Sequence, residues 1–290
     1  MKTCPWCGCT DITPYIKLKD YFLSGENFDV LECSRCHLLF TDPRPHGEEA
    51  SKYYKSENYL SHQENTQGFI PRVYEFVKSY NLKNKANMAS QDLSAGKVLD
   101  IGCGVGDFLL SMQRLGWSVM GIEPSPEARH IAGKRLGFEP LTPDDYELLP
   151  NHSFDLITLW HVLEHVDDLH NQVSQLQRLL KPGGRLLLAL PNFKSFDAFY
   201  YQQYWAAWDV PRHLNHFYPG SIHSIFDTTP FKLIDIQKLR WDAYYISYLS
   251  ETYKHHTLPL IRGAFVGLRS NIKARRSGMY SSLVYRFKLD

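Results

Sequence analysis

From Lys97 onward, short apolar stretches alternate with amphipathic ones, and this alternation limits the possible folds more than any other feature of the sequence. Glycine, serine and proline residues separate stretches of strand length from segments with helical periodicity. The expected strands cover residues 97–101, 118–122, 154–159, 185–190 and 231–238, and the expected helices cover 107–115, 126–137 and 169–180. Such alternation predicts an α/β fold, in which helices cover both faces of a parallel sheet.

The composition is that of a globular protein with a large core. Of the 290 residues, 43% are hydrophobic, so the chain can bury enough apolar surface to fold without disulfide bonds. Lys and Arg exceed Asp and Glu by only one charge, which makes nucleic acid an unlikely partner. No apolar run resembles a secretory signal or approaches the ~18 residues of a membrane-spanning helix. We therefore expect a cytoplasmic protein.

Four cysteines near the N-terminus form two C-x2-C pairs, Cys4 with Cys7 and Cys33 with Cys36. Four thiolates suffice for a closed tetrahedral zinc site, which predicts a zinc ribbon at residues 1–45 with a structural metal. The run that ends in His37 also matches the C-x-x-C-H pattern of haem attachment, and a redox dithiol is a further alternative. Haem attachment requires export, for which we expect no signal, and a redox role leaves the second cysteine pair unexplained, so zinc is favoured.

Three glycines follow the first expected strand of the central region, at positions 102, 104 and 106. Glycines here allow a tight turn that brings backbone N–H groups against a ligand at a helix N-terminus. Their G-x-G-x-G spacing differs from the G-x-G-x-x-G of dinucleotide-binding folds. Asp100 lies where it would face a cationic group, and Glu123 ends the next strand, where it would accept hydrogen bonds from ribose hydroxyls.

These residues resemble the class I S-adenosylmethionine-dependent methyltransferases. The resemblance is carried by four segments in order over about a hundred residues: Val98–Gly106, Gly121–Pro124, Phe154–His165 and Leu180–Leu186. It implies a Rossmann-like sheet of seven strands, with 231–238 as the sixth and 281–289 as an antiparallel last strand. We therefore expect a methyltransferase domain at residues 95–290, with a basic helical insertion at about 241–277.

The resemblance also assigns cofactor-binding residues. Asp100, Gly102 and Gly104 would hold the methionine part of S-adenosylmethionine and Glu123 the ribose. Asp144 or Asp145 would lie beside the adenine, although the run from Thr142 to Tyr146 departs from the family pattern. The remaining cofactor-binding candidates are Cys103, Gly106 and Trp160.

Candidate catalytic residues come from two places. His161 and His165 follow the strand at 154–159, where parallel sheets place their ligands. A proline-bent stretch after Trp205 contributes Asp209, His213 and His216. Methyl transfer to a hydroxyl needs a base, and these groups are the candidates, with a hydrogen-bonded surface network as the alternative. Eight aromatic residues between 193 and 208 belong mostly to the core, and some of them are expected to line an acceptor pocket.

Two segments outside these motifs have helical patterns. The pattern of residues 46–94 predicts a helical linker, with Val73, Phe76, Val77 and Tyr80 on one face. This linker is either a helix that packs on the rest of the protein or a lid that covers the cofactor. Residues 254–276 carry six Lys or Arg, no acidic residue and an apolar stripe. We expect the stripe to pack on the sheet, and peripheral membrane contact is the alternative.

Three functions remain compatible with the sequence. The first is methyl transfer, expected as O-methylation, to a small-molecule or glycan (sugar-linked) acceptor. The second is an RNA methyltransferase that docks its substrate on the zinc ribbon, although residues 1–40 have balanced charge. The third is a cofactor-binding module without enzymatic activity. The sequence leaves the acceptor atom and the oligomeric state open.

Overall fold

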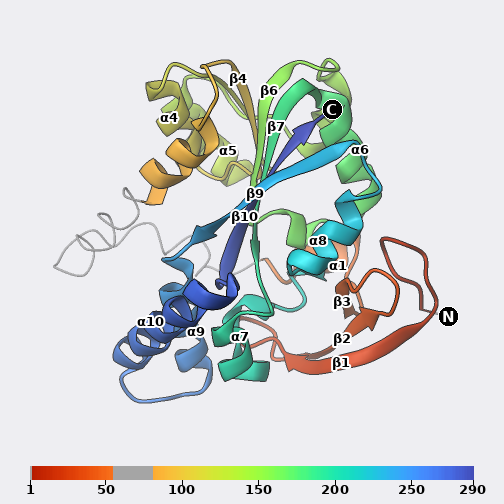
Figure 1. Cartoon of the computed structure of the whole chain (residues 1–290), viewed down its shortest axis with the longest axis vertical. Helices are drawn as coiled ribbons and strands as arrows, with labels where there is room; N and C mark the ends of the chain where they lie inside the picture. The colour runs from red at the N-terminus through yellow and green to blue at the C-terminus, as the bar shows by residue number, and fades with distance from the viewer. Residues whose placement is uncertain (1, 55–80) are drawn as a thin grey trace.

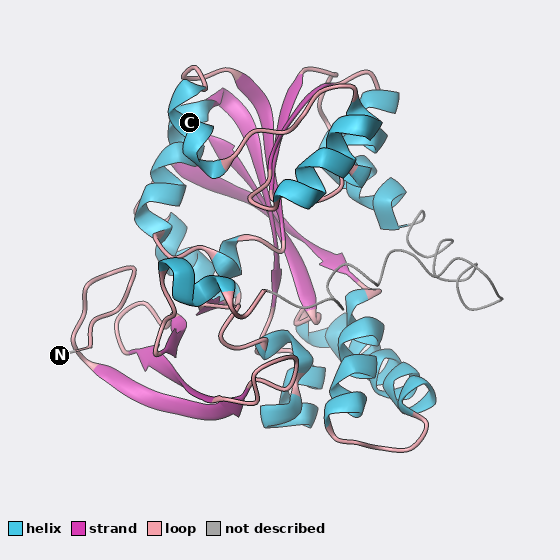
Figure 2. Cartoon of the chain, turned by 180° about the vertical axis from the view of Figure 1, so that it is seen from behind, coloured by secondary structure: helices cyan, strands magenta, loops and turns pink. Residues whose placement is uncertain are grey.

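The protein folds into two sheets, described here from a computed structural model that covers residues 2–54 and 81–290. Figure 1 shows the larger sheet flanked by helices, with β1–β3 at its lower end and α9 and α10 beside them. Figure 2 gives the same arrangement from behind. None of the helices in these two ranges is long and apolar enough to cross a bilayer.

The larger sheet has the strand order β5-β4-β6-β7-β10-β9. β4 to β7 run parallel, whereas β10 is antiparallel to both neighbours. The sequence thus predicts this sheet closely, including the reversed last strand. The strands are β4 (Lys97–Ile101), β5 (Ser118–Ile122), β6 (Phe154–Trp160), β7 (Leu180–Pro191), β9 (Phe231–Leu239) and β10 (Ser282–Leu289).

The seventh strand of the expected sheet is reduced to a single residue among those described. Leu141 forms an isolated parallel bridge with Ile122, in which its N–H donates to Gly121 and its carbonyl accepts from Glu123. The next residue of this ladder that would donate to β5 is Pro143, two positions on, and it has no N–H. In the part of the chain that the structure describes, the sheet therefore has six strands and one bridge instead of seven full strands.

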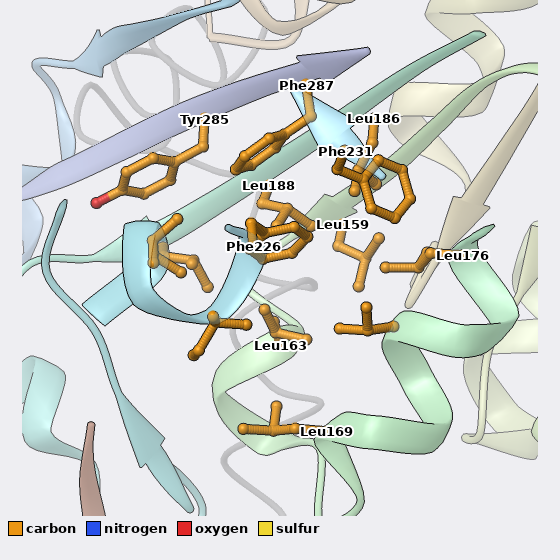
Figure 3. Packing of buried hydrophobic residues seen from close by; sticks show 14 of the residues in the cluster. Leu159, Leu163, Leu169, Leu176, Leu186, Leu188, Phe226, Phe231, Tyr285 and Phe287 are labelled. Atoms are coloured by element: carbon orange, nitrogen blue, oxygen red, sulfur yellow. The ribbon is translucent and has the colours of Figure 1, made fainter. Parts of the chain in front are cut away.

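Helices cover both faces of this sheet. One face packs against α4 (Asp107–Arg114), α5 (Pro126–Leu136) and a helical segment at 81–90. The other packs against α6 (Leu169–Leu179) and α8 (Pro219–Phe226). Figure 3 shows this second core, where Leu163, Leu169 and Leu176 face Leu159, Leu186 and Leu188, and Phe226 stacks on Phe287. The fold is that of an α/β sandwich, and the glycine turn lies at the carboxyl end of β4.

The smaller sheet joins the N-terminal segment to a much later part of the chain. Its order is β1-β2-β3-β8, formed by β1 (Ile12–Lys19), β2 (Asn27–Cys33), β3 (Leu39–Asp42) and β8 (Asn215–His216). Thr41 donates its hydroxyl to the carbonyl of His213 at 2.7 Å. Trp6 stacks on His170 at the start of α6, with 4.2 Å between ring centroids. The boundaries expected at residues 45 and 94 stay predictions.

Short helices connect these layers. Three of them bring the chain from β7 to β8: α7 (Phe196–Tyr201), η3 (Gln202–Tyr204) and η4 (Ala206–Trp208). The others are α1 (Gly47–Ser51), η1 (Pro143–Leu148) and η2 (Leu163–His165). Of the linker expected at 46–94, α1 and the helical segment at 81–90 are seen. Val73, Phe76, Val77 and Tyr80, on which the lid hypothesis depends, lie outside the described residues.

The expected packing of the apolar stripe at 254–276 is wrong. In the sequence, α9 (Asp242–Tyr253) and α10 (Pro259–Ser277) come between β9 and β10. In the structure, α10 packs on α9 instead of on the sheet. Small residues form this contact, since a Cβ at Gly263 would lie 2.7 Å from the backbone of Tyr248. The small residues lie on the opposite face from the stripe, which is exposed: Leu258, Ile261, Phe265, Leu268 and Ile272.

Candidate active site

The glycine turn after β4 has the backbone that the sequence predicts. Gly102 and Gly104 have φ values of +71° and +53°, which favour glycine. A Cβ at Gly102 would lie 2.5 Å from Val162 Cγ2, whereas nothing lies within 4 Å of the corresponding point at Gly104. Gly106 caps α4 with its own positive φ. The turn is thus packed at one glycine and open at the next.

Asp100, directly before this turn, is a buried carboxylate. Its Oδ1 accepts a hydrogen bond from Thr158 Oγ1 at 2.6 Å. Burial raises the pKa of Asp100 to about 7, and the nearby charge of Lys85 opposes this rise. A buried carboxylate of this kind favours a cationic ligand, since a positive charge would stabilise its ionised form.

Lys85 lies in the same place and was not predicted from the sequence. Its Nζ is 4.7 Å from the ring centroid of Trp160. Burial lowers the pKa of Lys85, while Asp242 and Asp100 oppose this change. Trp160 also has a buried indole N–H with no hydrogen-bond partner within residues 2–54 and 81–290. The site therefore offers an unused donor to a ligand, while its burial disfavours the charged form of Lys85.

Glu123 ends β5 on the other side of the turn. Its two oxygens accept hydrogen bonds from the backbone N–H groups of Gly104 and Ser125, each at 2.9 Å. These bonds hold the carboxylate beside the glycine turn, and each oxygen retains a lone pair for a ribose hydroxyl. Cys103 is buried in contact with Gly121 and its thiol pKa is raised by burial, as fits a packing residue.

The two candidates for the adenine side differ. Asp145 accepts hydrogen bonds from the backbone N–H and the hydroxyl of Thr142, both at 2.8 Å, and so caps η1. The backbone bond holds its pKa below the usual range. Asp144 is exposed. Both follow the bridge at Leu141, next to the end of β5, so they lie at the expected edge of the site.

His161 lies between two carboxylates at the end of β6. Its Nε2 is 3.1 Å from Asp242 and its Nδ1 is 3.3 Å from Glu164. Burial lowers the pKa of His161, but these ion pairs outweigh it and raise the pKa to about 9. His161 is therefore an imidazolium at neutral pH, which can donate a proton but cannot accept one.

The structure brings His165 and His213 together, with 4.7 Å between their ring centroids. His165 Nδ1 donates to the carbonyl of Arg212 at 2.9 Å, and His213 Nδ1 donates to that of Ala207 at 2.9 Å. Burial lowers the pKa of His213 to about 4, so its ring is neutral at physiological pH. A small cavity lined by Glu164, His213 and His216 adjoins this pair.

Asp209 and His216 have structural partners. Both Asp209 oxygens accept hydrogen bonds from Arg212, which also binds Asp20 of the N-terminal segment. His216 is buried, pairs with β3 and lies 3.0 Å from the hydroxyl of Thr41. Burial holds its pKa well below the usual value. Of the five predicted catalytic residues, His165 and His213 therefore have the most available ring nitrogens.

The four N-terminal cysteines also converge. Their sulfur atoms all lie within 4.8 Å of one another, with 3.5 Å between Cys4 and Cys36 and 3.4 Å between Cys7 and Cys33. Sulfurs at ~2.3 Å from a tetrahedral zinc lie about 3.8 Å apart. The cluster thus fits the donor set and the size of a Cys4 zinc site.

Comparison with known proteins identifies the fold family. A family model described as a methyltransferase domain matches residues 73–236, more than half of the 290 residues. The chain belongs to this methyltransferase family. Two solved structures share its fold. A phosphoethanolamine N-methyltransferase from Haemonchus contortus in complex with S-adenosyl-L-methionine has a TM-score of 0.55 and 16% identity, and the match covers 96% of this chain and 68% of that one. A geranyl diphosphate methyltransferase in complex with S-adenosylmethionine has a TM-score of 0.51 and 14% identity, and the match covers 86% of this chain and 93% of that one.

Curated relatives of this methyltransferase cover a shorter region. A ubiquinone biosynthesis O-methyltransferase from Thiobacillus denitrificans is 36% identical over 107 residues, 34% of this chain and 46% of the relative. A mitochondrial protein of the same description from Schizosaccharomyces pombe is 36% identical over 104 residues, 33% of this chain and 38% of the relative. The chain spans less than half the length of these relatives.

Sequence reasoning about this methyltransferase missed two residues at its site. Lys85 lies in a polar segment, and no sequence feature distinguishes it from other lysines nearby. Glu164 stands between two singled-out histidines, in the run from Trp160 to His165, yet it is 1% exposed. The feature visible in the sequence is an acidic residue within a short turn between two histidines, and it could have been used.

Alanine at Gly104 should weaken binding of S-adenosylmethionine at least tenfold, because a methyl group would enter the open part of the turn. Gly137→Ala is the matched control, since Gly137 also has a positive φ and nothing within 4 Å of its Cβ position. Both changes should lower the free energy of unfolding by about 1 kcal/mol. Calorimetric titration tests this prediction, and equal affinities for the two variants would contradict it.

The affinity for S-adenosylmethionine should fall as the pH drops below 7, by up to tenfold per unit. In the free protein Asp100 becomes protonated below about 7 and loses its attraction for a cation. Because this pKa lies above the usual 3.8, ionisation of Asp100 costs folding stability as the pH rises from 3.8 to about 7.

Titration of the Asp100→Asn variant between pH 5 and 8 checks this cause. The variant should bind more weakly at pH 8 and lose the pH dependence. Asp144→Asn, which removes an exposed carboxylate at the edge of the site, should retain the wild-type profile. A pH dependence that persists in Asp100→Asn would assign the effect to another group.

Proposed function

We propose that this methyltransferase transfers the methyl group of S-adenosylmethionine to an oxygen atom of a small-molecule acceptor. The observation that carries the proposal is the buried Asp100 beside the open glycine turn, with Glu123 on its other side. Asp100 would attract the cationic methionine part and Glu123 would accept from the ribose. Bound there, the cofactor supplies an electrophilic methyl group on a positively charged sulfur.

The acceptor side favours oxygen as the methylated atom. Curated relatives described as ubiquinone biosynthesis O-methyltransferases support this choice. His213 is neutral, its Nδ1–H is used by a carbonyl, and it borders a small cavity, so its other nitrogen can accept a hydroxyl proton. His165 lies against it and is accessible in part.

The glycan acceptor and the RNA alternative remain predictions from the sequence. No relative reported above acts on a glycan or on RNA by its description. In the N-terminal sheet, Lys17 forms an ion pair with Asp29, and neutralised lysines of this kind do not favour a polyanionic partner. We therefore favour a small hydroxylated acceptor over a glycan or an RNA acceptor.

Methyl transfer is tested with labelled S-adenosylmethionine and three acceptor pools: small hydroxylated aromatics, sugar-linked extracts and total RNA. The expected result is label in the first pool, as a base-stable ether, at a rate that His213→Ala lowers at least a hundredfold. His223→Ala, which changes an exposed histidine on α8, is the control. Label in the RNA pool alone, or in no pool despite cofactor binding, would overturn the proposal.

We also propose that the cysteine cluster holds a structural zinc ion. Four thiolates would close the coordination sphere and leave no position for a substrate. The metal would join the two cysteine pairs at the ends of the hairpin formed by β1 and β2. The stacking of Trp6 on His170 would then fix this hairpin against α6.

The exposed stripe of α10 supports a further partner, the surface of an acidic membrane. Ile261 and Phe265 are 65% and 58% exposed, and Arg262, Arg269 and Lys273 lie exposed on the same helix. An apolar face beside basic residues is typical of helices that lie in the headgroup region of anionic bilayers. Contact there would suit an apolar acceptor dissolved in the membrane.

Flotation with phosphatidylglycerol vesicles tests this contact. The wild type should float with the vesicles, and a variant with Ile261→Asp and Phe265→Asp should stay at the bottom of the gradient. Leu148→Asp is the control, because Leu148 is exposed on η1, away from α10. A wild type that stays at the bottom, or that sediments as a dimer disrupted by the two aspartates, would reject membrane contact.

A further inference from the structure

Glu164 is a buried carboxylate whose oxygens have no hydrogen-bond partner among the described residues. It lies in η2, directly after β6, and is 1% exposed. His161 forms an ion pair with Oε1 at 3.3 Å, but without the geometry of a hydrogen bond. A buried carboxylate normally receives several hydrogen bonds or a cation, because its charge is otherwise costly to desolvate.

Two histidines present free ring nitrogens beside this carboxylate. One ligand atom from each of Glu164, His165 and His213 can be chosen so that all three lie within 4.8 Å of one another. Both histidines use Nδ1–H to donate to a backbone carbonyl, which leaves Nε2 as the nitrogen with an available lone pair. Metal-binding histidines typically have this second hydrogen bond, since it fixes the ring and the tautomer.

We propose that Glu164, His165 and His213 bind a divalent transition-metal cation, at a second site apart from the cysteine cluster. Two imidazoles and one carboxylate are a donor set used for zinc and for ferrous iron, with further positions left for oxygen ligands. Ligands at ~2.1 Å from a tetrahedral ion lie about 3.4 Å apart, so the three groups must close by about an ångström.

The surroundings fit such an ion. The cavity next to Glu164 and His213 gives space for an oxygen ligand, and His161 would support the carboxylate from behind. Asp209 lies 4.0 Å from His213 Nε2 and adds negative charge nearby. The turn that carries Glu164 follows Val162, which packs against Gly102, so the ion would lie close to the cofactor turn.

The consequence for catalysis rests on the proposed O-methyl transfer. With the cation bound, His213 Nε2 would be a metal ligand and could no longer act as the base, so the cation would activate the hydroxyl instead. An acceptor hydroxyl bound to the cation would have a lowered pKa and lose its proton to solvent. Its oxygen would then form a bond to the methyl carbon as the carbon–sulfur bond breaks and its electron pair returns to sulfur. Acceptors with two neighbouring oxygen atoms would be preferred because both can contact the cation.

Manganese binding tests the site independently of methyl transfer. Protein loaded with zinc at the cysteines is titrated with Mn²⁺, and the loss of the free Mn²⁺ spectrum is followed by electron paramagnetic resonance. The wild type should bind one equivalent, and Glu164→Gln and His213→Asn should each weaken binding at least tenfold. His223→Ala, which removes an exposed histidine on α8, should bind as the wild type does.

Spin-echo modulation of the wild-type Mn²⁺ complex adds a measurement that needs no variant. Coupling to two imidazole nitrogens supports the site, and coupling to none overturns it. The proposal is also overturned if no Mn²⁺ binds at about 1 mM, or if folded Glu164→Gln binds as tightly as the wild type. If methyl transfer is absent but Mn²⁺ binds with two nitrogens, the metal site stands and only the proposed function fails.

Discussion

The buried guanidinium of Arg212 joins the N-terminal sheet to the loop that follows η4. It is 3% exposed as a side chain and donates to Asp209 in its own loop and to Asp20 near the N-terminus. Its backbone carbonyl accepts the Nδ1–H of His165. Leaving one partner of a buried ion pair alone costs about 3–5 kcal/mol. The N-terminal sheet, the loop after η4 and the histidine turn are therefore expected to keep one fixed arrangement.

The cofactor region follows directly from local sequence. A short apolar strand, three glycines and an acidic residue leave few choices of backbone, and β4, β5 and their positive-φ glycines appear where the pattern places them. Strand ends in a parallel sheet meet at one edge, so Asp100 and Glu123 had to lie near one another. The limit of this reasoning is visible at Leu141, where one proline reduces a strand to a bridge.

The acceptor region could be predicted only in composition. The sequence shows that histidines and acidic residues are abundant between 161 and 216. It cannot show which histidine ring nitrogens are already hydrogen-bonded to backbone carbonyls or to Thr41. The same limit applies to α10. Its apolar stripe predicts a buried face, yet Gly263 and Gly267 let the backbones of two helices approach so closely that the opposite face is the buried one.

The pairing of β3 with β8 has a consequence for the order in which the chain matures during synthesis. His216 leaves the ribosome 175 residues after Thr41, its hydrogen-bond partner. At about 5–20 residues per second, the outer edge of β3 waits roughly 10–35 s for its neighbour. During that interval the nascent hairpin exposes an unpaired edge, the kind of surface that templates aggregation. Translation that stalls before Asn215 would leave this edge permanently open.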